Sequence, residues 1–121
     1  MAKVFIDANF LFDIAERNKV KKTQLNGHKI YISPLSLHIL FYTYKYQVPR
    51  KEIIELKEEF YIADFSEKIL SLALQGPSSD FEDNVQLHSA VMTDCNYFLT
   101  DDKNLLKMKF FGKAEIKSKI P

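Results

Sequence analysis

The sequence has very little of what covalent or metal cross-links require. It contains a single cysteine, Cys95, among 121 residues, so no disulfide can form within the chain. The residues around Cys95 also lack the spacing of zinc ligands. Cys95 is therefore predicted to pack as a small, buried hydrophobic residue.

Long apolar runs and a large charge of one sign are missing as well. The longest apolar stretch, Ile30 to Phe41, contains serine, proline and histidine and is too short to span a bilayer. The N-terminus lacks the apolar region of a signal peptide, so we expect a cytoplasmic protein with no membrane partner. The formal net charge is only +1, so total charge gives no argument for binding nucleic acid.

The chain does have enough apolar content to form a core. Hydrophobic residues make up 46% of the sequence and charged residues 27%, as in an average globular protein. No repeat, low-complexity tract or linker divides it. Residues 1–121 are therefore predicted to form one domain.

Strand patterns and helix patterns alternate along the chain. Strands are expected at residues 3–6, 29–33, 60–62 and 97–100, with a last edge strand at 114–116. Helices are expected from Asn9, over 34–46 and 49–57, after Ser66, and over 80–94 and 104–107. This alternation predicts an α/β fold in which helices cover both faces of a mostly parallel sheet.

Aspartates stand where two of these strands end and where one helix begins. Asp7 follows the first strand, Asp101 and Asp102 follow residues 97–100, and Asp83 lies in the first turn of the helix over 80–94. Ligands of open parallel sheets bind outside the carboxyl ends of the strands. Carboxylates gathered there repel one another unless a cation compensates. Mg²⁺ or Mn²⁺ would supply that charge and activate a water for phosphodiester hydrolysis.

A second interpretation of each aspartate competes with this one. A single aspartate after a strand, or in the first turn of a helix, is more often a cap for backbone N–H groups than a metal ligand. The metal-site prediction therefore rests on the joint placement of the aspartates.

Three segments together resemble the PIN domain family of nucleases: VFIDANFLFD at the N-terminus, KIYISPLSLHILFY, and SDFEDNVQLHSAV followed by CNYFLTDD. They occur in the family's order through nearly the whole chain. The resemblance implies a PIN-like three-layer α/β/α fold with a central, mostly parallel sheet. It also implies a metal-dependent endoribonuclease similar to VapC-type toxins, with an RNA substrate, a cognate antitoxin and a homodimeric state.

The same resemblance assigns roles to residues of this chain. Asp102 is preferred to Asp101 because it ends a Thr-x-Asp pattern, although the doublet keeps Asp101 as an alternative. Asp7, Asp83 and Asp102 are implied as the catalytic and metal-binding acids, and Asn9, Thr100, Asp101, Asp80 and Glu82 as supporting residues.

One position departs from the family pattern. Where the family usually has a glutamate, on the helix after the serine-containing strand, this chain has Ile39. Either Glu82 or His38 replaces the missing acid, or the site has lost a ligand. Glu82 is about 100° around a helix from Asp83, so we expect it at the rim. The loss of a ligand would leave a catalytically attenuated module that binds RNA or a protein partner. A different metal phosphohydrolase on the same scaffold is a third interpretation.

An aromatic cluster and a histidine complete the candidates. Phe41, Tyr42, Tyr44 and Tyr46, next to Lys45, could stack on RNA bases. A contribution to the core and to a dimer interface is favoured. His88 is predicted to lie at the surface rather than in the site.

Overall fold

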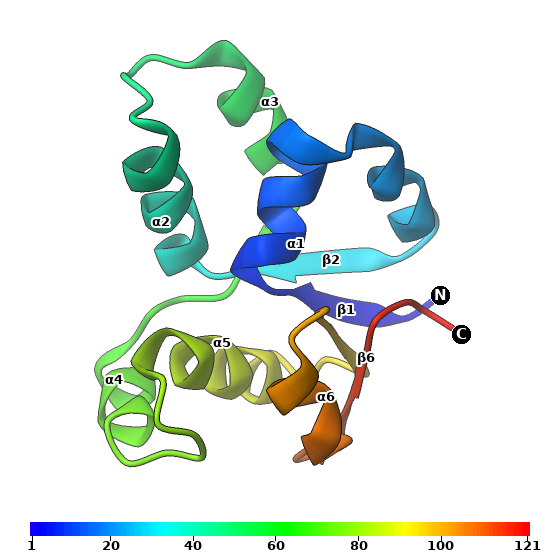
Figure 1. The fold of residues 1–121 in the computed structure, drawn as a ribbon, viewed down its shortest axis with the longest axis vertical. Coiled ribbons are helices and arrows are strands. Elements are labelled where there is room, and N and C mark those ends of the chain that lie inside the picture. Colours follow the sequence, from blue (N-terminus) through cyan, green and yellow to red (C-terminus); the bar gives the residue numbers. More distant parts are fainter.

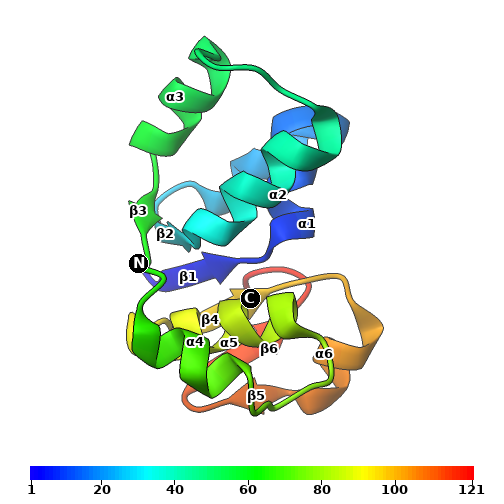
Figure 2. The same cartoon turned by 90° about the vertical axis from the view of Figure 1, so that its left-hand side faces the viewer.

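The computed structural model describes residues 1 to 121 and shows one six-stranded sheet between helices (Figures 1 and 2). The strand order is β3-β2-β1-β4-β6-β5. The strands are β1 (Lys3–Ile6), β2 (Lys29–Ile32), β3 (Tyr61–Ile62), β4 (Tyr97–Leu99), β5 (Phe110–Phe111) and β6 (Ala114–Lys117). All neighbours are parallel except β5 and β6. The predicted fold class is confirmed.

Six α-helices connect the strands. They are α1 (Ala8–Phe12), α2 (Pro34–Tyr44), α3 (Lys51–Glu58), α4 (Glu67–Ala73), α5 (Phe81–Met92) and α6 (Lys103–Met108). The end of α1 continues as a π-helical turn, Asp13–Arg17, and a 3₁₀ helix, Lys19–Leu25, follows it. No helix is long and apolar enough to cross a membrane.

Alternating side chains of the central strands divide the core into two layers. Val4 and Ile6 of β1 pack with the cluster that includes α1, α2 and α3. Phe5, between them, points to the opposite face, where it stacks on Phe98 of β4 with ring centroids 5.5 Å apart. Successive strand residues face opposite ways, so both faces are apolar and both are covered. Figure 1 shows α1, α2 and α3 on one side of β1 and α5 and α6 on the other.

Helix starts are set by the side chains that the sequence predicted. Ser33 caps α2 by accepting a hydrogen bond from the Leu35 N–H, and Ser66 caps α4 through the Ile69 N–H. A side-chain oxygen at this position satisfies an N–H that the helix itself cannot. Pro34 follows Ser33 in the first turn of α2, where a missing N–H costs nothing.

Two expectations need correction, and one strand was not predicted. The edge strand predicted at residues 114–116 is β6, and it lies between β4 and β5. The true edge strand, Phe110–Phe111, is too short for an alternating pattern to reveal, and a turn at Gly112 (φ 59°) returns it onto β6. Helix α2 ends at Tyr44 rather than Tyr46, because Lys45 adopts a left-handed conformation (φ 53°).

Candidate metal site

The predicted aspartates meet where the sheet changes its winding direction. From β1 the chain builds outward through β2 and β3, whereas β4 returns to the other side of β1 and continues to β6. The point between β1 and β4 is thus the switch point at which open α/β sheets bind ligands. Asp7 and Asp102 follow these two strands, and the Asp7 N–H donates to the Leu99 carbonyl at 3.1 Å.

A cavity of about 200 Å³ at this point collects acidic side chains. Five carboxylates line it, and no lysine or arginine does: Asp7, Asp80, Glu82, Asp83 and Asp102. They come from the ends of β1 and β4 and from the first turn of α5 and the residue before it. We call this site the acidic cavity.

Capping and cavity lining are compatible roles for these aspartates. Oδ1 of Asp7 accepts from the Phe10 N–H at 2.8 Å, and Oδ1 of Asp102 accepts from the Asn104 N–H at 2.8 Å. Asp80 uses Oδ1 in the same way for the Asp83 N–H. Each cap occupies one oxygen, and for Asp80 and Asp102 the second oxygen makes no hydrogen bond within the chain. The two interpretations of the aspartates therefore do not exclude each other.

Asp7 is the most enclosed acid of the cavity, with 4% of its surface exposed. Burial raises the pKa of Asp7, because an ionised carboxylate loses hydration there. Hydrogen bonds from Thr100 and from the Phe10 N–H oppose the rise. The Thr100 hydroxyl also accepts from the Asp102 N–H at 3.0 Å. Thr100 thus links the two strand-end aspartates.

Asp83 faces both desolvation and repulsion. Burial, followed by the charges of Asp80, Asp102, Asp7 and Glu82, raises the pKa of Asp83 to about 6. Its carboxylate has no hydrogen-bond partner in the chain. A carboxyl in such surroundings favours either a proton or a cation.

Lys21 holds the side chain of Asp101 apart from that of Asp102. The Lys21 ammonium lies 2.7 Å from a carboxylate oxygen of Asp101 and 2.7 Å from one of Asp13. It also lies over the Phe10 ring. Asp101 is therefore held outside the acidic cavity, whereas Asp102 lines it.

A buried amide that the sequence analysis did not identify, that of Gln86, joins α5 to α1. Oε1 of Gln86 accepts from the Ala8 N–H at 2.6 Å, and its Nε2 donates to the Glu82 carbonyl at 3.2 Å. Gln86 is 2% exposed. Its spacing of three residues from Asp83 puts both on one side of α5, which is the only sequence signal that could have indicated it.

Comparisons with known proteins bear on the fold. No family model matches this sequence, and the search of curated proteins returns no match. Among solved structures, the crystal structure of VapBC2 from Rickettsia felis bound to a DNA fragment from their promoter contains a similar chain. The TM-score is 0.68 at 14% sequence identity, over 95% of this chain and 97% of that chain. The chain has a PIN-like fold.

Ile39 lies in the wall of the acidic cavity; it stands where the sequence resemblance led us to expect a glutamate. Of the two residues considered as replacements, Glu82 lines the cavity and His38 does not. His38 is exposed. Glu82 is exposed as well, which agrees with its expected place at the rim.

The surroundings of Asn9 and His88 differ from those expected. Asn9 lines the cavity, but its side chain forms no hydrogen bond to a carboxylate; its backbone carbonyl accepts from Arg17 and from the Asp13 N–H. His88 is partly buried rather than at the surface, and its Nε2 lies 2.9 Å from the Gly76 carbonyl. It takes no part in the acidic cavity.

The cavity suits a hard divalent cation by its chemistry. All of its charged groups are carboxylates, the ligands that Mg²⁺ and Mn²⁺ prefer. No three His, Cys, Asp or Glu side chains are gathered closely enough to hold a metal ion as they stand. Mg²⁺ keeps several of its waters and often takes only one or two protein carboxylates. The residues present therefore fit such an ion without a preformed cage.

Proposed function

We propose that this protein is a metal-dependent RNA endonuclease. The observation that carries the proposal is the convergence of five carboxylates, with no basic group, on one cavity at the switch point of a PIN-like sheet. Their repulsion needs a cation, and a polyanionic substrate cannot approach them without one.

In this proposal Asp7, Asp83 and Asp102 hold Mg²⁺ or Mn²⁺. Such an ion lowers the pKa of a bound water and neutralises charge on a phosphodiester oxygen. The Thr100 hydroxyl supports the Asp7 carboxylate and accepts from the Asp102 backbone N–H, so it helps to position both residues. Lys21 keeps Asp101 turned away from the cavity. Glu82 stands at the rim of the cavity, where its carboxylate could take over part of the role that a glutamate at position 39 would have.

A role as the toxin of a toxin–antitoxin pair extends the proposal. The solved structure with a similar fold is a VapBC2 complex bound to promoter DNA. By analogy with that assembly, we propose a cognate antitoxin as a partner; the homodimer rests on the sequence resemblance alone. Both can be tested by co-purification from cells that express this gene together with its neighbours.

The test uses substitutions that keep the helix caps. Asparagine retains Oδ1, so Asp7→Asn and Asp102→Asn remove a charge and leave the cap bonds possible, and Asp83→Asn breaks no hydrogen bond. Each variant is expected to lose more than about 100-fold of the Mn²⁺-dependent cleavage of a mixed RNA pool. Asp64→Asn, at an exposed position outside the cavity, is the matched control. Cleavage that survives all three cavity substitutions would disprove the proposal.

One observation favours a second candidate function. Ile39 in the cavity wall and the absence of a preformed metal group also fit a catalytically attenuated module that binds RNA or a protein partner. This alternative predicts RNA binding that needs no divalent ion and survives Asp83→Asn. RNA binding that is lost on chelation would contradict it.

A further inference from the structure

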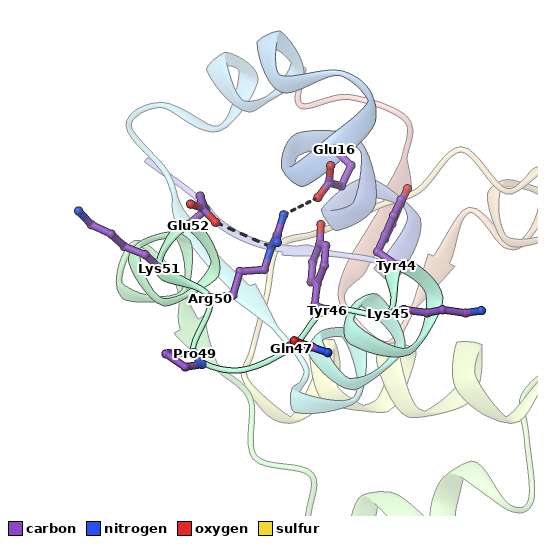
Figure 3. Close-up of a pocket in the computed structure, with 9 residues that line it drawn as sticks. All are labelled: Glu16, Tyr44, Lys45, Tyr46, Gln47, Pro49, Arg50, Lys51 and Glu52. Carbon is purple, nitrogen blue, oxygen red and sulfur yellow. Dashed lines mark ion pairs between the residues drawn. The ribbon is translucent and has the colours of Figure 1, made fainter.

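A second and larger cavity lies between the end of α2 and the start of α3. Its volume is about 650 Å³. Its walls include Glu16, Tyr44, Lys45, Tyr46, Arg50 and Glu52 (Figure 3). Figure 3 shows Arg50 between Glu16 and Glu52, with the Tyr46 ring beside it. We call this site the arginine pocket.

Arg50 is held in place by aromatic contact rather than by tight ion pairs. Its guanidinium carbon lies 3.8 Å from the centre of the Tyr46 ring, and Tyr46 stacks on Tyr44. The nearest carboxylate oxygens are 3.5 Å from Nη2, on Glu16, and 3.8 Å from Nε, on Glu52. A guanidinium stacked on an aromatic ring is fixed in orientation, and here its N–H groups remain available to a stronger acceptor.

Two buried polar atoms of the pocket have no hydrogen-bond partner in the chain. They are Nε of Arg50 and the Tyr46 hydroxyl oxygen. Because both atoms are buried, a ligand in the pocket would meet the Nη groups of Arg50, whose nearest carboxylate oxygen is 3.5 Å away, and these donors favour a ligand rich in acceptor oxygens. A phosphate group offers several, and arginine binds it through charge-assisted hydrogen bonds.

Aromatic and basic side chains connect this pocket to the acidic cavity. Phe12 lines the acidic cavity and contacts Tyr44 edge-to-face, with ring centroids 5.8 Å apart. The Arg17 guanidinium lies 5.6 Å from the centre of the same Phe12 ring. On α2, Ile39 lines one site and Tyr44 the other, and five residues advance a helix by roughly 7.5 Å. The two sites therefore lie within reach of one short strand.

We infer that the arginine pocket is a second subsite for single-stranded RNA, where Arg50 binds a backbone phosphate a few nucleotides away from the bond in the acidic cavity. The inference rests on the proposed nuclease function and names the form of its substrate. Lys45 and Lys51, which project outward on either side of the pocket in Figure 3, add positive charge along the strand. Alternating basic and aromatic side chains are typical of single-strand binding surfaces.

The experiment measures RNA affinity as a function of salt. All variants keep the acids of the cavity and are measured with Mn²⁺, and the probe is a fluorescent, cleavage-resistant phosphorothioate oligouridylate of about 12 nucleotides. Arg50→Met is expected to weaken binding about tenfold at low salt. It is also expected to reduce the slope of log K against log[salt] by about 0.7, the loss of one phosphate contact on a single strand. Lys68→Met, an exposed charge deletion on α4, should change neither beyond a small nonspecific effect.

Probe length and two further variants sharpen the result. A trinucleotide, which can occupy the acidic cavity alone, should bind Arg50→Met and the control equally. Arg50→Lys should keep the salt slope while it loses part of the affinity, because the ammonium keeps the charge but not the planar fork. Glu16→Gln removes the competing carboxylate and should tighten binding. Because Glu16→Gln is expected to raise RNA affinity, it tests the subsite even if Arg50→Met fails to fold.

Two results would overturn the inference and have different meanings. If the unmodified protein cuts RNA but Arg50→Met and Glu16→Gln bind the long probe like the control, the subsite is wrong and the nuclease stands. A carboxylate-bearing protein segment would then be the better occupant of the pocket. If no variant binds RNA and the unmodified protein cuts none, the nuclease proposal and the subsite fail together.

Discussion

The acidic cavity and the arginine pocket are built by different means. In the acidic cavity, backbone N–H groups at helix starts fix Asp7, Asp80 and Asp102, so like charges are held together despite their repulsion. In the arginine pocket, ring stacking fixes one cation, Arg50, beside carboxylates that it meets only loosely. The first arrangement calls for a bound cation and the second for a bound anion. Together they suit a substrate that bridges a metal ion and an arginine.

The strongest way to break the acidic cavity without touching an acid is to remove Gln86. Gln86→Leu would leave the Ala8 N–H buried without its acceptor, at a cost of about 1–3 kcal/mol in unfolding free energy. Urea unfolding followed by circular dichroism measures the loss. Gln24→Leu is the control, because Gln24 is exposed and its side chain makes no hydrogen bond. Equal stability of the two variants would show that Gln86 does not join α1 to α5.

Placing an acid at position 39 should increase the cation affinity of the acidic cavity and leave the arginine pocket unchanged. Ile39→Glu adds a carboxylate to the cavity wall, and we expect about a tenfold gain in Mn²⁺ affinity, or roughly 1.4 kcal/mol. Ile39→Gln has the same shape without the charge and should show no gain. Calorimetric titration gives both values. A weaker affinity in Ile39→Glu than in Ile39→Gln would place position 39 outside the reach of the ion.

The smallest expected effect concerns the protein without metal. Because the pKa of Asp83 is raised to about 6, the folded protein binds more protons than the unfolded chain between that value and the ordinary one. Proton binding by Asp83 therefore stabilises the folded protein against unfolding. This stabilisation is complete below pH 4 and is lost as the pH rises through 6. At neutral pH, Asp83→Asn should therefore be more stable than the parent by ~1 kcal/mol after allowance for solvent screening.

Thermal unfolding in EDTA at several pH values measures this difference. The gain in Tm should be about 4 °C at pH 7 and should vanish near pH 4. The exposed control, Asp64→Asn, should show no such trend. A gain that stays constant with pH would mean that repulsion at Asp83 is not its cause.

Local signals explain why much of the acidic cavity could be predicted from the sequence. The strands before Asp7 and Asp102 and the cap at Asp80 are set by residues within a few positions in the chain. A local Thr-x-Asp pattern favoured Asp102 over Asp101, but the contact that holds Asp101 outside the cavity comes from Lys21, eighty residues away. The hydrogen bond from the Ala8 N–H to Gln86 joins residues 78 positions apart, and no local sequence pattern predicts it.

The arginine pocket could not be predicted either, because it too depends on contacts that no local pattern encodes. The sequence pointed to the tyrosines of α2 and to Lys45, but nothing in it placed Arg50 on the Tyr46 ring. That contact depends on how the chain turns between α2 and α3, over residues 45–50. Likewise, the favoured role of the aromatic cluster in the core holds for Phe41, Tyr44 and Tyr46, whereas Tyr42 is 79% exposed.

The most direct test of the central claim is a calorimetric titration of Mn²⁺ into the purified protein, with Asp83→Asn and Asp64→Asn measured alongside. We predict binding in the parent and in Asp64→Asn, and its loss in Asp83→Asn. Binding should also weaken as the pH falls below about 6, because protons compete for Asp83. No heat of binding in the parent at millimolar Mn²⁺ would contradict a metal-dependent nuclease.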